Sequence, residues 1–135
     1  MKQNATIFVT GIQSVDGEKD KIEFSSEGTV EQSTRGMKFT YHEMTDEGES
    51  SETVLTFIGE TVKIDRSGAN EMTMIVQKGR RRGCTLSTPA GPLVIGTFGT
   101  SLSLGTDNLS IKYDLDMNSV LMSQNELHIK YILDK

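Results

Sequence analysis

The strict alternation of apolar and polar residues near the end of the sequence is its most constraining feature. Apolar residues occupy every second position from Leu109 to Met117, and again from Leu127 to Leu133. A period of two places all of these side chains on one face of a β-strand. Both segments are therefore predicted to be half-buried antiparallel strands, joined by a turn at Asn118-Ser119.

The alternation changes phase within the returning strand. Val120 and Met122 are apolar at even positions, whereas the apolar residues from Leu127 onward stand at odd positions. A slip of one residue moves every side chain of a strand to the opposite face. We therefore predict a β-bulge between Ser123 and Asn125.

Shorter segments with the same period recur through the chain, at residues 6–10, 21–25, 37–42, 62–65, 72–77 and 101–104. Glycine-rich and Asp/Asn-rich turns separate them, and no apolar stripe has the 3.6-residue spacing of a helix. Val54–Ile58 is apolar on both faces, which predicts that another element or a partner covers it. The pattern predicts one all-β domain over residues 1–135, an antiparallel up-and-down meander of about 8–10 strands closed into a barrel.

Charge and cysteine content exclude several classes of partner. The chain carries 14 Lys and Arg against 19 Asp and Glu, a net charge of −5, which disfavours nucleic acid as a partner. No apolar run reaches the ~18 residues of a membrane span, and the first residues contain no stretch typical of a signal peptide. Cys84 is the only cysteine, so no intrachain disulfide can form. We expect a cytoplasmic protein without a membrane partner.

Several short motifs resemble those of one bacterial family. In chain order they are Glu27-Gly28, Lys38–Glu43, Arg66-Ser67-Gly68, Gly79 before a basic stretch, Thr88–Gly91 and Ser123–Leu127. In order and spacing they resemble the YwiB-like family, whose function is unknown. The resemblance implies a calycin-like β-barrel, related in fold to the lipocalins, and it implies no activity. The chain has no tryptophan, and so lacks the Gly-x-Trp signature of true lipocalins.

Extending the alternation places two opposite charges inside the barrel. Glu43 follows Tyr41 on one inward face, and Arg66 follows Val62 and Ile64 on another. Arg66 is predicted to bind a carboxylate or phosphate at one end of an apolar cavity. The alternative is a structural Arg66–Glu43 pair that plugs the barrel or faces solvent. Met74 completes the candidate ligand-binding set.

Methionines supply many of the apolar positions on the alternating segments. Flexible thioether side chains suit an irregular apolar pocket, and they fill an ordinary core equally well. Those predicted for the interior are Met37, Met72, Met74, Met117 and Met122.

The dense basic run Lys78–Arg82 is the candidate interaction surface, with Arg80, Arg81 and Arg82 as its main residues. Two glycines bracket these charges, which favours the alternative of a solvated hairpin tip. No aromatic residue stands among the arginines, so base stacking is not supported.

Catalytic and metal-binding signatures are missing from the sequence. His42 and His128 alternate onto outward faces of separate strands, and neither has metal-ligand spacing with Cys84. An enzyme would need a cleft that gathers one of these histidines with an acid. We therefore expect a non-enzymatic barrel without cofactor or metal that binds a small apolar or amphipathic molecule. The alternative is a solid barrel that docks a protein, or a second copy of itself through Val54–Ile58.

Overall fold

The computed structural model describes residues 2–44, 48–68, 71–117 and 120–134, which form ten antiparallel β-strands. The strands are β1 (Lys2–Val15), β2 (Glu18–Gln32), β3 (Gly36–Met44), β4 (Ser50–Ile58), β5 (Thr61–Gly68), β6 (Met72–Gln77), β7 (Arg81–Thr88), β8 (Gly91–Leu104), β9 (Asn108–Met117) and β10 (Val120–Leu133). Each strand pairs with its neighbours in sequence, and β1 also pairs with β10, which closes the sheet. The predicted all-β barrel meander is confirmed. The turn predicted at Asn118-Ser119 lies outside the described residues.

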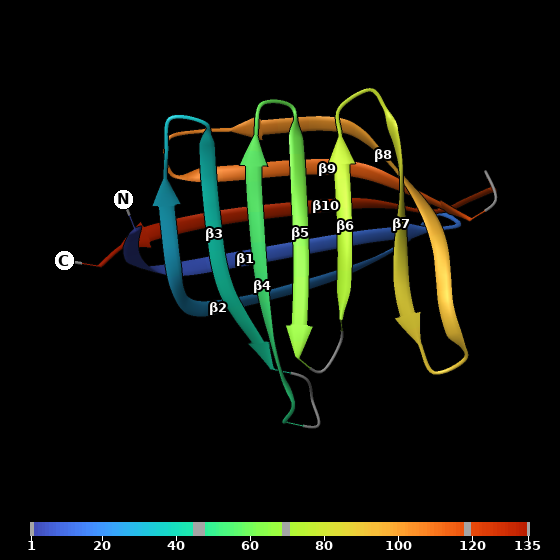
Figure 1. Cartoon of the computed structure of the whole chain (residues 1–135), viewed down its shortest axis with the longest axis horizontal. Coiled ribbons are helices and arrows are strands. Elements are labelled where there is room, and N and C mark those ends of the chain that lie inside the picture. The colour runs from blue at the N-terminus through green and yellow to red at the C-terminus, as the bar shows by residue number, and fades with distance from the viewer. Residues whose placement is uncertain (1, 45–47, 69–70, 118–119, 135) are drawn as a thin grey trace.

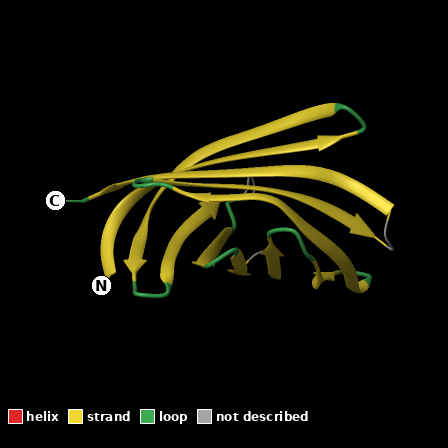
Figure 2. Ribbon diagram, turned by 90° about the horizontal axis from the view of Figure 1, so that it is seen from above, coloured by secondary structure: helices red, strands yellow, loops and turns green. Residues whose placement is uncertain are grey.

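The barrel is flattened into two layers whose strands run crosswise. Strands β3 to β7 form the front layer in Figure 1, and β1, β9 and β10 lie behind them, while β2 and β8 bend between the two layers at the sides. Viewed from above, the layers meet on the side of the chain termini and spread apart on the opposite side (Figure 2). Crossed layers of this kind enclose a wedge of space that side chains fill unevenly.

Gly28 marks the point where β2 leaves the back layer. This strand pairs with β1 along its whole length, but with β3 only from Thr29 to Gln32. A Cβ atom at position 28 would collide with the carbonyl oxygen of Thr40. Glycine therefore permits the close approach of the two backbones.

The core consists of the inward residues of the alternating strands. Leu109 and Ile111 are fully buried, and Tyr113 and Leu115 pack against them from the same strand. The inward face predicted for this segment is confirmed from Leu109 to Leu115. Among the described residues there is no helix that could cross a bilayer.

The predicted β-bulge of β10 exists, but its predicted place is wrong. The register against β9 shifts between Leu121 and Ser123, so the extra residue is Met122. Ser123 and Asn125 are already turned inward, with exposed fractions of 4% and 9%. Because Ser123 and Asn125 are polar, they do not contribute to the apolar alternation from which the inward face and the bulge were predicted.

The predicted interior methionines divide between the core and the surface. Met37 and Met74 are buried, and Met72 packs against the core. Met117 is half-buried and lies outside the core cluster. Met122 is 45% exposed, so its prediction is wrong, because the bulge at this position turns it to solvent.

The segment Val54–Ile58 of β4 is apolar on both faces, as predicted. Leu55 and Phe57 point inward, whereas Ile58 is 49% exposed. On the outer face, Val54 and Ile58 line a shallow groove of about 450 Å³ together with Lys38 and Lys63.

Candidate ligand-binding site

A single row of inward side chains crosses the front layer and ends at the opening between the layers. Tyr41 of β3 lies opposite Thr53 of β4, Thr53 lies opposite Arg66 of β5, and Arg66 lies opposite Met72 of β6. The alternation of each strand fixes these four residues on the same face. Arg66 is therefore the one cation of an otherwise neutral inward row.

A cavity of about 430 Å³ opens beside this row, at the side where the two layers spread apart. Its apolar wall consists of Met72, Met74, Ile95, Leu115 and Leu127. Arg66, Tyr113, Asn125 and Gln13 supply polar groups to the same space. Three further charged residues border it, namely Asp20, Lys21 and Glu126. A mainly apolar cavity of this size with a few convergent polar groups is typical of a small-molecule site. Of the predicted set, Arg66 and Met74 line it, and Tyr41 and Glu43 do not.

Two neighbouring polar atoms in the row have no hydrogen-bond partner. They are Nε of Arg66 and Oγ1 of Thr53, and both are buried. No ion pair within 4.0 Å joins Arg66 to Glu43 among the described residues. A buried donor without a partner costs free energy, and its persistence calls for a water, an ion or a ligand.

Two tyrosines flank Arg66 from opposite layers, of which Tyr41 is buried and Tyr113 is half-buried. Burial raises the pKa of Tyr41 to about 12, and the positive charge of Arg66 opposes this rise while Glu43 adds to it. Burial likewise raises the pKa of Tyr113 to about 12, again opposed by Arg66. Both hydroxyl groups therefore keep their protons at neutral pH.

The back layer contributes a polar pair that sequence reasoning missed. Asn125 donates from Nδ2 to Oγ of Ser123 at 2.9 Å, and both side chains are buried. They stand at odd positions, in phase with the apolar residues from Leu127 onward. Extending that parity backwards would have assigned them to the interior.

The wall between β6 and β7 is incomplete. Among the described residues, these strands pair at Met72 with Leu86 and at Thr73 with Thr85. A separate bridge joins Gln77 to Arg80 at the turn. Nearer the turn, the hydroxyl of Thr97 in β8 reaches the carbonyl oxygen of Ile75 and lies 3.3 Å from that of Arg82. We call this junction the β6–β7 seam.

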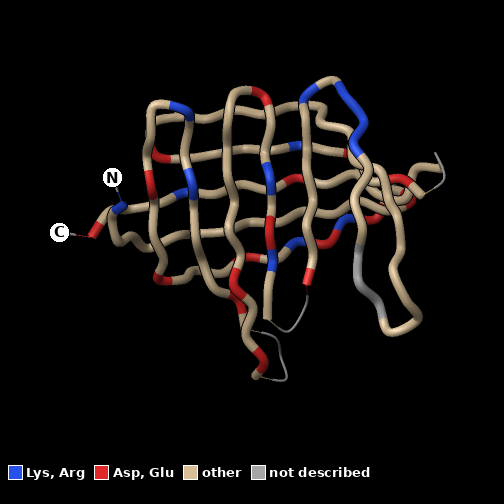
Figure 3. The backbone as a smooth tube through the Cα atoms, viewed as in Figure 1, with Lys and Arg blue, Asp and Glu red and all other residues tan. Residues whose placement is uncertain are grey.

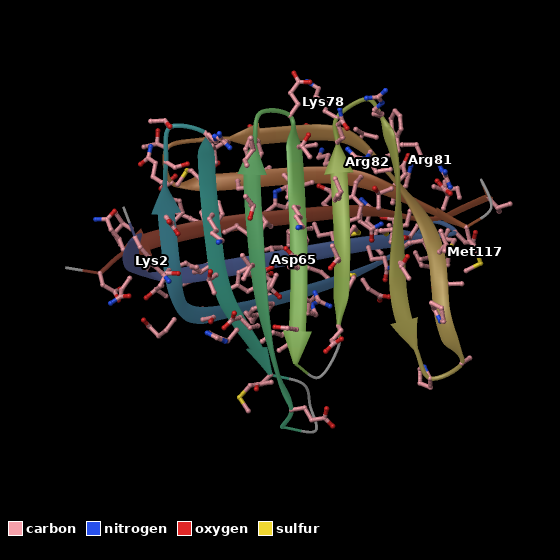
Figure 4. The ribbon with its side chains drawn as sticks, in the orientation of Figure 1. Lys2, Asp65, Lys78, Arg81, Arg82 and Met117 are labelled. Atoms are coloured by element: carbon pink, nitrogen blue, oxygen red, sulfur yellow. The ribbon has the colours of Figure 1, made fainter. Side chains whose placement is uncertain are left out.

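A groove of about 650 Å³ lies along the seam, and Met72, Arg66 and Cys84 contribute to its lining. Asp65, Ser67, Glu71, Thr73 and Thr85 supply its polar groups. Figure 4 shows Asp65 on β5, in the front layer. Arg66 and Met72 also line the inner cavity, so the two spaces meet at these side chains.

The arginines of the basic run Lys78–Arg82 have different surroundings. Lys and Arg gather at the β6–β7 turn in Figure 3. Arg81 belongs to β7, and its Nε and Nη2 donate to Asp116 at 2.9 and 2.6 Å. Arg82 donates from Nη1 to Gln77 at 2.9 Å, and Arg80 is exposed. The hairpin tip predicted over this whole run therefore ends at Arg80.

Neither histidine lines the inner cavity, but Glu126, which borders it, lies 3.2 Å from Nε2 of His128. Cys84 lines the groove along the seam. His42 is exposed, 4.0 Å from Glu52, and His128 contacts Ser110 and Glu126 on the outer face. Cys84 is buried, as predicted, and burial raises the pKa of its thiol. Within the described ranges, no three His, Cys, Asp or Glu side chains are placed to hold a metal ion.

Comparisons with known proteins agree with this architecture. The fold matches the crystal structure of the ywiB protein from Bacillus subtilis with a TM-score of 0.83 and 22% sequence identity, over 99% of this chain and 94% of that one. No curated protein matches the sequence. The family model described as "Domain of unknown function (DUF1934)" matches residues 7–129. The chain therefore belongs to the DUF1934 family, a domain of unknown function.

Proposed function

We propose that the barrel binds a small amphipathic molecule, with an anionic group at Arg66 and an apolar part in the inner cavity. The observation that carries this proposal is the buried Nε of Arg66, which has no hydrogen-bond partner at the edge of a mainly apolar space. A guanidinium binds a carboxylate or a phosphate through two parallel hydrogen bonds. A bound oxygen anion would satisfy the donor that the protein leaves unpaired.

The other candidate residues have distinct roles in this proposal. Tyr113 lines the cavity as a neutral donor, and Met74 supplies adaptable apolar surface. Tyr41 is buried at the far end of the row, where the charge of Arg66 lowers its pKa against the effect of burial. Glu43 contributes only its charge, which opposes ionisation of Tyr41.

The proposed role is binding without catalysis, in a reducing cytoplasmic compartment, and it needs no cofactor. Neither His42 nor His128 lines the inner cavity, which supports binding over catalysis. Cys84 as the sole cysteine supports a reducing compartment.

Native mass spectrometry of protein purified without detergent tests the proposal. The expected result is a protein peak with extra mass that denaturation releases as a defined small molecule. Arg66→Gln should abolish this adduct, while Arg80→Gln, a matched change at an exposed arginine, should leave it. The proposal fails if the wild-type mass is bare and the organic anion 1-anilinonaphthalene-8-sulfonate binds wild type and Arg66→Gln equally.

A second candidate function is self-association through the outer face of β4. The observation in its favour is the outer groove, where Ile58 is 49% exposed beside Lys38 and Lys63. Size-exclusion chromatography with light scattering should then give a dimer for wild type and a monomer for Ile58→Asp. A wild-type monomer would remove this candidate.

A further inference from the structure

We propose that the bound amphiphile is zwitterionic and crosses the β6–β7 seam, with its tail in the inner cavity and an amine-bearing head group in the groove outside. This inference rests on the proposed function and adds the class of ligand and the path that it takes through the wall. The anionic group would lie at Arg66, where the inner and outer spaces meet.

The seam is the weakest described junction of the wall beside Arg66. Two residue pairs hold β6 to β7, whereas six pairs hold β5 to β6. At the turn end, a bridge between Gln77 and Arg80 closes the seam again, and the Thr97 hydroxyl bonds to the Ile75 carbonyl. The stretch without backbone pairing lies between the Thr73–Thr85 pair and the Gln77–Arg80 bridge. A linear ligand can therefore pass there without breaking ladder hydrogen bonds.

Arg66 lies between the inner cavity and the outer groove, where it would bind the anionic group of the ligand. The inner cavity and the outer groove share two lining residues, Arg66 and Met72. Met72 is an unbranched side chain that can change rotamer at low cost. A ligand confined to the inner cavity would make no contact with the sides of Arg66 and Met72 that face the outer groove.

The chemistry of the outer groove selects the head group. Asp65 is occupied, since it accepts a hydrogen bond from Thr73 at 3.1 Å and lies 3.8 Å from Lys63. Glu71 is exposed, and no ion pair or hydrogen bond engages it within the described residues. The hydroxyls of Ser67, Thr73 and Thr85 add acceptors around it. A primary ammonium finds both a free carboxylate and neutral acceptors here.

A matched pair of probes tests the inference. Dodecanoyl lysophosphatidylethanolamine and dodecanoyl lysophosphatidylglycerol share the chain and a singly charged phosphodiester, and differ in that the first carries an ammonium where the second carries a neutral diol. Titration calorimetry below their micelle concentrations should show wild type binding the ethanolamine compound about fivefold more tightly, the size expected of an exposed ion pair. Arg66→Gln should weaken both compounds by at least ~30-fold, because both lose the guanidinium.

Two single-charge variants locate the head group. Glu71→Gln should bring the affinity ratio of the two probes close to one, with little effect on the lysophosphatidylglycerol. Asp20→Asn is the matched control, because Asp20 borders the inner cavity at the open side of the barrel, away from the seam. It should leave the ratio unchanged.

The outcomes separate this inference from the proposed function. If neither probe binds wild type, the proposed function fails and this inference with it. Equal affinities for the two probes in wild type would overturn the zwitterionic ligand alone. A ratio that collapses in Asp20→Asn but survives Glu71→Gln would show that the head group leaves by the open side, and so would overturn the path through the seam.

Discussion

The guanidinium of Arg81 lies against Gly96 while it binds both carboxylate oxygens of Asp116. Its Nε is 2.9 Å from Oδ2 and its Nη2 is 2.6 Å from Oδ1, and a Cβ at position 96 would overlap the guanidinium. Gly96 is the register partner of Asp116, so the absent side chain makes room for the bidentate geometry. A glycine in β8 and a charge pair between β7 and β9 thus depend on each other.

Gly96→Ala should lower the free energy of unfolding because it displaces Arg81 from Asp116. The same change in an Arg81→Met background should have a much smaller effect, since the overlapping guanidinium is gone. Chemical denaturation of the four proteins gives the coupling between the two positions. Strict additivity would mean that the pair does not depend on the glycine.

Gly28→Ala should destabilise the barrel by about 2–4 kcal/mol, because the new methyl group meets the backbone carbonyl of Thr40. Gly83→Ala is the control within another strand, where a Cβ meets nothing within 4 Å. It should change stability by at most about 0.5 kcal/mol. Urea unfolding curves compare them, and equal losses would contradict the crossing described at Gly28.

Arg66→Met should stabilise the ligand-free protein by about 1 kcal/mol, because it removes a buried donor without a partner. Thr53→Val should act in the same direction, since it replaces a buried hydroxyl by a group of similar shape. Thermal unfolding of protein stripped of small molecules makes the comparison. A large loss of stability in Arg66→Met would instead assign this arginine a structural role.

Thr97→Val should destabilise the protein by about 1–2 kcal/mol, because Thr97 is fully buried and bridges the seam. Hydrogen exchange should accelerate most in β6 and β7, where that bridge replaces ladder bonds. Thr56→Val, on the outer side of the fully paired β4–β5 ladder, serves as control. Unchanged exchange in β6 would contradict the bridging role.

Alkaline pH should destabilise the fold through two of its tyrosines. Both Tyr41 and Tyr113 have a pKa of about 12 in the folded protein against an ordinary value of 10.0. The folded state therefore holds more protons between these values, and stability present below pH 10 is lost as the pH rises toward 12. Each tyrosine accounts for about 2–3 kcal/mol. Denaturation at several pH values should show a shallower decline for Tyr41→Phe, and an unchanged slope would place its hydroxyl in water.

The alternation of apolar and polar residues was sufficient to predict most strands and their inward faces, as the buried Leu109 and Ile111 illustrate. Two kinds of information lay beyond it. The partner of Arg81 is Asp116, in another strand far along the chain, and alternation gives a face without naming what lies opposite. The bulge at Met122 was misplaced because inward Ser123 and Asn125 carry no apolar signal.

The candidate site was predictable only in part for the same reason. Alternation assigned Arg66 to the interior, and the register that places it beside Thr53 follows from turn lengths and pairing. Its lack of an ion pair with Glu43 depends on side-chain positions in three strands. The sparse β6–β7 pairing also escaped prediction, because the sequence of Met72–Gln77 reads as an ordinary strand.

Because β1 pairs with β10, the ten strands form a closed ring, and any of them could come first in the sequence without changing the strand neighbours. The amide of Asp134 donates to the carbonyl of Asn4 at 2.9 Å, so the two ends of the described chain meet within one hydrogen bond. A short linker between them, with a cut in another hairpin, would trace the same circle of strands as a circular permutant. In the native order the β1–β10 ladder joins the most distant parts of the sequence, and permutation would turn it into a local hairpin. A circular permutant should therefore form its strand pairs in a different order from the native chain and reach the same barrel.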